Sequence, residues 1–268
     1  MSVLDPGTGS DEAYRLDASK PRSIGEIVRA AGALYRRYPL LFAILAAAVI
    51  VPYELIVLAA TGDGPLRHGH ENAGVSWLLL LLRTSLITPL VSALHMHAVV
   101  TIAKGRRPRL AEVARRGAMA LPVVAAAEIV SGIGIFLGSI ALVVPGILLA
   151  VRWAVVAQAA ALEGKGWVDA LRSSRRLTTG HGWHAFGLLL VTGVLNAAVL
   201  FGARAIPLGS SSGAGSVAVG TTVETLVASF SALTLALLYF DLQARRDAAG
   251  AETPRTAPRE HAHLRDLD

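Results

Sequence analysis

The chain has no cysteine, and this absence excludes several kinds of chemistry at once. Disulfides, thiol nucleophiles, and zinc or iron–sulfur centres held by cysteine cannot form. Charged residues are also scarce, because aspartate, glutamate, lysine and arginine together make up 16% of the chain, whereas hydrophobic residues make up 53%. Most of the charges lie outside the long apolar runs, so these runs are the main structural signal.

Six apolar runs are each long enough to cross a bilayer as a helix, since a hydrocarbon layer about 30 Å thick needs roughly 20 residues at about 1.5 Å per residue. The runs are Leu40 to Ala60, Trp77 to Ile102, Met119 to Leu137, Ile140 to Leu162, Ala185 to Ile206 and Val217 to Phe240. The sequence therefore predicts an all-α fold, a polytopic transmembrane helical bundle with six spans.

Lysine and arginine are distributed unevenly among the connecting segments. Six precede the first run, six lie in the second connector, four in the fourth and five after the last run, so 21 of the 25 fall on one side of the predicted zigzag. Cationic segments near span ends are retained in the cytoplasm. The distribution predicts a multi-pass protein of the bacterial plasma (inner) membrane with both termini cytoplasmic. It also explains the basic pI without a nucleic-acid partner.

The predicted organisation is a six-span membrane domain at residues 23–242 between two polar ends. Residues 1–22 and 243–268 lack apolar periodicity and are predicted to be disordered and cytoplasmic. No separate catalytic domain is expected, and no nucleophile and base show a recognisable spacing, so we expect a non-enzymatic protein without a cofactor. The histidines occur in close pairs without an HExxH frame, so no metal site is expected.

Short amphipathic helices are predicted before spans 1, 3 and 5. Ser23 and Glu26 fit a capping box, which would begin the first of these helices. Three hairpins, each preceded by such a helix, would form three parallel repeats, although any chain that re-enters a membrane from the cytoplasm looks basic and amphipathic there. These helices are expected to lie in the headgroup layer, with lipid contacts from Arg29, Arg36, Arg37, Arg115, Arg116, Arg172, Arg175 and Arg176.

Five ionisable residues lie inside the apolar runs: Glu54, Arg83, Glu128, Arg152 and Glu224. A bare charge facing lipid is costly, so each should face protein or water. Matching depths predict that Arg83 pairs with Glu54, with Glu224 at a similar level. Glu128 and Arg152 are predicted to pair nearer the midplane. Two interpretations stay open: neutralised pairs that fix the helix register, or a relay or polar pocket for an ion or substrate.

Two glycines near the end of the third run, Gly134 and Gly138, form a GxxxG pair. Small residues at this spacing lie on one helix face and allow close approach of two backbones. We therefore expect a neighbouring helix to pack closely against this face.

The stretch from Val144 to Gly187 combines Pro145-Gly146 at the start of a span, Arg152 within it, Leu162-Glu163-Gly164, the Ala170 to Ser174 helix, and Trp183 at the start of the next span. These features resemble a bacterial membrane-protein family, the membrane domain of glycerophosphoryl diester phosphodiesterases. Ser23 to Ile27 with Tyr35 to Arg37, and Tyr239 to Leu242 with Arg245-Arg246, look like the family's two ends, so the resemblance covers about residues 23 to 246.

The resemblance implies six spans but not phosphodiesterase activity, because the family name comes from members fused to a catalytic barrel that these 268 residues do not include. Our leading hypothesis is an accessory or organising protein that engages the lipid bilayer through anionic headgroups at the inner leaflet, at about 1 kcal/mol per well-placed Lys or Arg. The alternative is a small transporter or channel that uses intramembrane charged residues, Glu128 and Arg152 above all.

Overall fold

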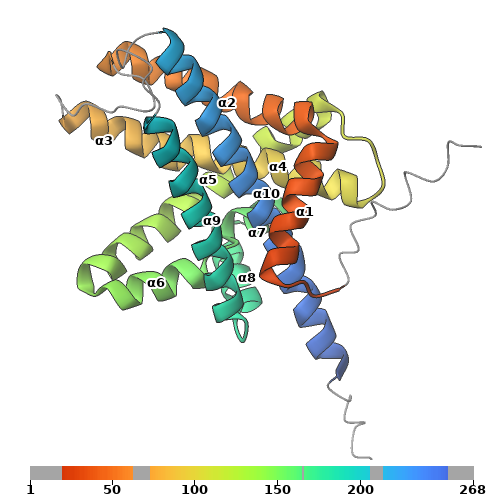
Figure 1. The fold of residues 1–268 in the computed structure, drawn as a ribbon. Helices are drawn as coiled ribbons and strands as arrows, with labels where there is room; N and C mark the ends of the chain where they lie inside the picture. The colour runs from red at the N-terminus through yellow and green to blue at the C-terminus, as the bar shows by residue number, and fades with distance from the viewer. Residues whose placement is uncertain (1–19, 63–72, 165, 206–213, 253–268) are drawn as a thin grey trace, which may run out of the picture.

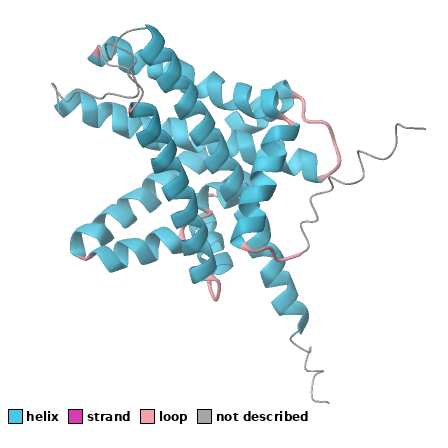
Figure 2. Cartoon of the chain, viewed as in Figure 1, coloured by secondary structure: helices cyan, strands magenta, loops and turns pink. Residues whose placement is uncertain are grey.

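The computed structural model describes residues 20–62, 73–164, 166–205 and 214–252, and these residues form helices with no strand among them (Figure 1, Figure 2). Six helical stretches are long and apolar enough to cross a membrane: Pro39–Thr61, Trp77–Ala103, Leu110–Ala141, Val143–Glu163, Gly182–Arg204 and Ala214–Ala249. They overlap the six predicted runs, so the predicted all-α bundle is confirmed. The ends 1–19 and 253–268, predicted to be disordered, lie outside the described residues.

Spans 1, 3, 5 and 6 are single helices, whereas spans 2 and 4 are interrupted. The elements are α1 (Ile24–Arg37), α2 (Pro39–Thr61), α3 (Ala73–Leu82), the π-helix η2 (Arg83–Ile87), α4 (Thr88–Ala103), α5 (Leu110–Ala141), α6 (Val143–Arg152), α7 (Val156–Glu163), α8 (Trp167–Thr178), α9 (Gly182–Arg204) and α10 (Ala214–Glu252). Because the spans alternate in direction, α1, α8 and the C-terminal end of α10 share one end of the bundle, which we call the basic end after its arginines.

Helix α10 runs through the middle of the bundle and contacts α2, α4 and α9 (Figure 1). Its buried face includes Leu233, Leu237 and Leu242, each at most 1% exposed. In the most apolar part of α10, 56% of the residues are buried, compared with 17% in the corresponding parts of α5 and α9. The exposed apolar surface of α5 and α9 has the composition expected of a surface that faces lipid.

Helix α1 begins at the predicted capping box. The Ser23 amide and hydroxyl donate to the Glu26 carboxylate at 2.7 and 2.8 Å, and these hydrogen bonds lower the pKa of Glu26. Ile27, Ala31 and Leu34 are fully buried, and the helix contacts α10, α2 and α9. The apolar face that was expected to enter the headgroup layer is therefore covered by protein.

The predicted amphipathic helix before span 3 is not a separate element. Helix α5 continues through Pro122 from Leu110 to Ala141, as one helix of 32 residues. The physical reason is that Val113, Gly117, Val124, Ala127 and Ser131 recur at helical spacing and form one buried stripe on both sides of the proline. Because the helix continues, the stripe is not broken. Helix α5 packs mainly against α4, α6 and α7. The three predicted repeat units therefore differ in structure, and their relation by a common axis stays a prediction.

Helix α10 also extends beyond the predicted end of the membrane domain at residue 242, and continues to Glu252. Leu242 and Ala244 are still buried, and Arg245 Nε lies 2.8 Å from Asp241 Oδ2 one turn earlier. Packing and this ion pair carry the helix past the last apolar run.

Helices α5 and α6 form a hairpin that diverges from the neighbouring ends of α3, α9 and α10 (Figure 1). Its helices are in close contact, because a Cβ added at Gly138 would lie 3.3 Å from the Gly146 backbone and one at Gly146 would lie 2.9 Å from Ser139 Cα. A Cβ added at Gly134 would lie 2.5 Å from the Trp153 ring. The GxxxG face is thus the face against which span 4 packs.

Candidate functional site

Three of the five charged residues inside the spans come together in one cluster. Arg83 Nη2 donates to Glu224 Oε2 at 2.6 Å, and Arg83 Nη1 lies 3.7 Å from Glu54 Oε1. The residues come from η2, α10 and α2, so three spans are joined by one guanidinium. The predicted proximity of Glu54, Arg83 and Glu224 is present in the structure.

The backbone around Arg83 is unusual. Residues Arg83–Ile87 form a π-helix, in which the Thr88 amide donates to the Arg83 carbonyl. Such π-bulges reorient side chains and occur frequently at functional sites. Tyr53 also lies beside the guanidinium, with its ring centroid 5.9 Å from Arg83 Cζ, and its hydroxyl donates to the Leu79 carbonyl at 3.1 Å. Arg83 therefore has an aromatic ring and two carboxylates as neighbours.

Glu54 is the least satisfied member of this cluster. It is 2% exposed, and neither of its carboxylate oxygens has a hydrogen-bond partner among the described residues. The carboxylate lines a cavity of about 270 Å³ between α2, η2, α4, α9 and α10. Besides Tyr53, the uncharged polar residues of the lining are Thr88, Ser92, Asn196 and Ser231. Sequence inspection did not single out these four, because isolated polar residues in an apolar helix give no signal of a shared cavity.

Glu128 and Arg152 do not form the predicted pair. Glu128 is half-buried on α5, Arg152 is exposed at the end of α6, and no described side chain of opposite charge lies within ion-pair distance of either. The depth comparison assumed a continuous span 4, but the helix is interrupted at Trp153–Val155. Counting residues along one continuous helix therefore does not give the depth of Arg152.

Arg152 instead lies beside the junction of α8 and α9. Its carbonyl accepts hydrogen bonds from the hydroxyls of Ser174 at 3.1 Å and Thr178 at 3.2 Å. Helix α9 begins a span at Gly182, so this junction belongs to the basic end of the bundle. Arg152 is therefore closer to the basic end than to the midplane, where the sequence had placed it.

An apolar groove of about 730 Å³ adjoins Arg152. The groove lies between α6, the C-terminal end of α8 and the first turns of α9. Its lining consists of apolar side chains together with Arg152, two threonines and two glycines: Val144, Ile147, Leu148, Val151, Arg152, Thr178, Thr179, Gly180, Gly182, Trp183 and Phe186. Trp183 is 86% exposed at its edge. One positive charge and two hydroxyl-bearing side chains thus lie at the edge of a long apolar surface.

The predicted lipid-contact arginines are all exposed at the basic end, on α1, α5 and α8. Two of them have acidic neighbours on their own helix: Arg116 Nη2 lies 2.7 Å from Glu112 Oε1, and Arg172 Nη1 lies 3.5 Å from Asp169 Oδ1. Exposed pairs of this kind are weak and do not prevent contact with other anions.

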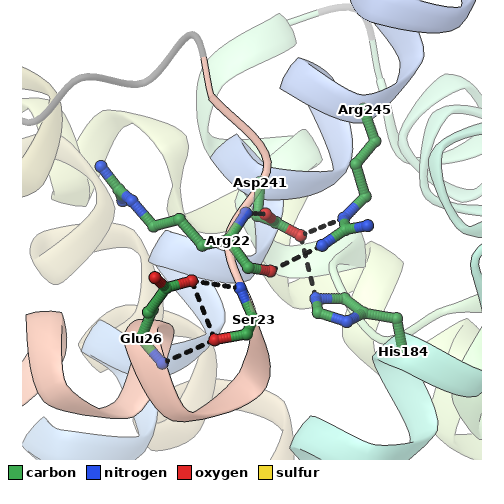
Figure 3. A network of polar contacts seen from close by, with 6 residues as sticks. All are labelled: Arg22, Ser23, Glu26, His184, Asp241 and Arg245. Carbon is green, nitrogen blue, oxygen red and sulfur yellow. Dashed lines mark hydrogen bonds and ion pairs between the residues drawn. The ribbon is translucent and has the colours of Figure 1, made fainter.

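Asp241 is the centre of a second polar network at the basic end (Figure 3). Its carboxylate accepts from the Arg22 amide at 2.5 Å and from Arg245 Nε at 2.8 Å, and lies 3.0 Å from His184 Nε2. Arg245 Nη2 also donates to the Arg22 carbonyl at 2.6 Å. The network joins the segment before α1 to α9 and α10. The spacing of Asp241 and Arg245 by four residues was the available sequence signal.

The segment that resembles the phosphodiesterase-associated membrane domain folds back on itself. Ser173 on α8 donates to Glu163 at the end of α7 at 2.5 Å, and the Tyr239 hydroxyl donates to the same carboxylate at 3.4 Å. Among the described residues, no three His, Asp or Glu side chains are grouped so that they could hold a metal ion. No protein-family model, curated protein or solved structure matches the chain. The family resemblance stays a prediction.

Proposed function

We propose that this multi-pass membrane protein is a non-enzymatic accessory or organising component that engages anionic phospholipid at the inner leaflet of the bacterial plasma membrane. The basic end would face the cytoplasm, in keeping with its many exposed arginines. The observation that carries the proposal is the groove beside Arg152, which combines an apolar wall with a cation that has no acidic partner in the described part of the chain.

The charge of Arg152 supports an anionic partner. A guanidinium at the edge of a membrane span is costly unless it is paired or hydrated, and Arg152 has no described acidic partner. A phosphate group accepts paired hydrogen bonds from a guanidinium. Thr178 and Thr179 also line the groove, but their hydroxyls already donate to backbone carbonyls, so the guanidinium of Arg152 supplies the donors that the phosphate would use.

The apolar part of the groove fits an acyl chain. Val144, Ile147 and Leu148 on α6 face Phe186 on α9 across it, so a chain extending from the headgroup toward the bilayer centre would contact apolar side chains on both sides. Trp183 lies at the edge, where an exposed tryptophan is typical of the membrane–water interface.

Lipid retention in nanodiscs tests this function. Wild-type protein should retain phosphatidylglycerol over phosphatidylcholine, as counted by native mass spectrometry, and should have a higher Tm in discs that contain the anionic lipid. Arg152→Gln should weaken phosphatidylglycerol retention by about fivefold, which corresponds to about 1 kcal/mol for one arginine. Arg204→Gln, an exposed arginine at the opposite end of α9, is the matched control and should behave as wild type. Equal retention of both lipids by the wild type would contradict the proposal.

The exposed arginines of α8 provide a second variant. Arg172→Gln, Arg175→Gln and Arg176→Gln combined should reduce retention of anionic lipid further, because each removes one positive charge from the basic end. The alternative of a small transporter or channel that uses Glu128 and Arg152 stays a prediction, because the missing ion pair between them bears only on their predicted role as a neutralised pair.

A further inference from the structure

We propose that the cavity between α2, η2, α4, α9 and α10 binds one monovalent metal cation at the carboxylate of Glu54. This site is separate from the lipid groove and does not depend on the proposed lipid function. It is built from the buried cluster of Glu54, Arg83 and Glu224 together with uncharged oxygen ligands of the cavity wall.

The charges of the cluster do not balance. Two carboxylates share one guanidinium, and Arg83 makes its short contact, 2.6 Å, with Glu224. Glu54 Oε1 is 3.7 Å from Arg83 and accepts no hydrogen bond from the residues that the structure describes, although Glu54 is 2% exposed. One negative charge therefore remains uncompensated inside a membrane span, where it is strongly unfavourable. A single added positive charge would balance the site.

The cavity presents the oxygen ligands that a hard monovalent cation prefers. Asn196 donates its side-chain amide to Ser231 at 2.7 Å and so keeps its amide oxygen as an acceptor. Thr88 and Ser92 add hydroxyl oxygens from α4. Coupling-ion sites in membrane proteins similarly combine a few oxygen ligands at interrupted helices, and here span 2 is interrupted by the π-helix beside the cavity.

The size of the cavity suits an ion that keeps part of its hydration. A volume of about 270 Å³ exceeds that of a bare ion, and a water molecule occupies about 30 Å³ in the liquid, so several waters fit beside the ion. A divalent ion would overcompensate the single excess charge. The titratable groups that face Glu54 are Tyr53 on its own helix, Arg83 on η2 and Glu224 on α10, whereas α4 and α9 contribute Thr88, Ser92 and Asn196.

Thermal unfolding of the full chain in phosphatidylcholine nanodiscs at pH 8 tests the site. Tm is measured as NaCl or KCl replaces choline chloride at constant ionic strength. One of the two metal ions should raise the Tm of the wild type saturably by a few degrees, since a ligand that binds only the folded state stabilises it. Glu54→Gln removes the excess charge, so its Tm should not depend on the cation. Glu224→Gln should also abolish the dependence, because Arg83 is then free to neutralise Glu54.

Glu112→Gln is the matched control, because Glu112 is paired with Arg116 near the start of α5 and does not line the cavity. It should keep the full cation dependence. Equilibrium dialysis of wild-type protein with ²²Na⁺ or ⁸⁶Rb⁺, the latter standing for K⁺, should give one bound ion per chain even if a variant fails to fold. Equal Tm values in sodium, potassium and choline would overturn the proposal. So would a Tm that rises on acidification to pH 5.5 without any metal dependence, because Glu54 would then take up a proton instead.

Discussion

Arg83 and Arg152 both lie within apolar spans, but their surroundings are opposite in charge and burial. Arg83 lies against Tyr53 and between two carboxylates supplied by other helices. Arg152 has no described acidic partner and lies at the edge of an apolar groove. The first arginine is therefore part of the internal structure of the bundle, whereas the second is exposed beside an apolar groove, where we propose that it engages lipid.

The two environments also differ in the sign of the charge that is in excess. At Arg83 the protein supplies more negative than positive charge, which favours a cation as the missing component. At Arg152 the described lining of the groove supplies only positive charge, which is the basis of the proposed anionic partner. Variants that neutralise one group at a time should therefore affect stability at the first site and lipid retention at the second.

The largest effect is expected from Arg83→Gln. Its removal leaves Glu54 and Glu224 as two buried carboxylates without a counter-charge, which should cost about 3 to 5 kcal/mol of unfolding free energy. The measurement is thermal or denaturant unfolding in neutral detergent at pH 8. Arg152→Gln under the same conditions should change stability little, and the triple neutral variant with Glu54→Gln and Glu224→Gln should recover much of the loss. An equal loss for both arginine variants would contradict the comparison.

The Asp241 network should give the next largest effect. Asp241→Asn weakens the contacts to Arg245 and His184 and should destabilise the protein by about 1.5 to 3 kcal/mol, the range for hydrogen bonds to charged groups. The loss is read from the unfolding midpoint. Asp169→Asn, which removes an exposed pair with Arg172, should change stability by less than about 1 kcal/mol. If Asp241→Asn left the unfolding midpoint unchanged, the network would not hold α9 and α10 together.

A smaller effect is expected where α5 packs against span 4 near Arg152. Gly134→Ala places a methyl group into the Trp153 ring and should cost about 1 to 3 kcal/mol through overpacking. Gly132→Ala meets no atom within 4 Å and should be neutral or slightly stabilising, because alanine favours the helix. Unfolding of the two variants side by side distinguishes close packing from a general effect of glycine replacement. The Gly134 variant should also alter lipid retention at the groove.

The smallest effect concerns the capping box of α1. Ser23→Ala should cost about 1 kcal/mol through loss of the cap. Glu26 has a pKa lowered by its hydrogen bonds with Ser23, so its stabilising contribution is present above its unfolded pKa and is lost as pH falls through the folded one. The Tm difference between wild type and Glu26→Gln should therefore be present at pH 7, decrease as the pH falls below the ordinary glutamate pKa of about 4.3, and vanish only below the lowered folded pKa. Persistence of the difference at low pH would argue against the cap.

Sequence patterns predicted the spans well because the property that defines them, a long apolar run, is local. Counting residues along spans 1, 2 and 6 also predicted that Glu54, Arg83 and Glu224 share a level, and the structure brings them together. The same counting failed for Glu128 and Arg152, because span 4 stops being helical at Trp153 and the count assumed a continuous helix.

The amphipathic helices show a similar limit. The apolar face of α1 is visible in the sequence, but a face of this kind can be covered by lipid or by protein. In the structure Ile27 and Leu34 are covered by the bundle. Before span 3, a buried stripe that passes Pro122 keeps the helix continuous, although a separate amphipathic helix was predicted there.

The sequence by itself determined the number of spans and the side on which the basic residues gather, because both depend on composition along the chain. Only the tertiary structure decided which charged side chains form ion pairs and which, among the described residues, do not. Pairing depends on helix interruptions and on side chains from distant spans, and neither is encoded in a local pattern. For that reason the cavity at Glu54 and the groove at Arg152 became visible only when the helices were packed together.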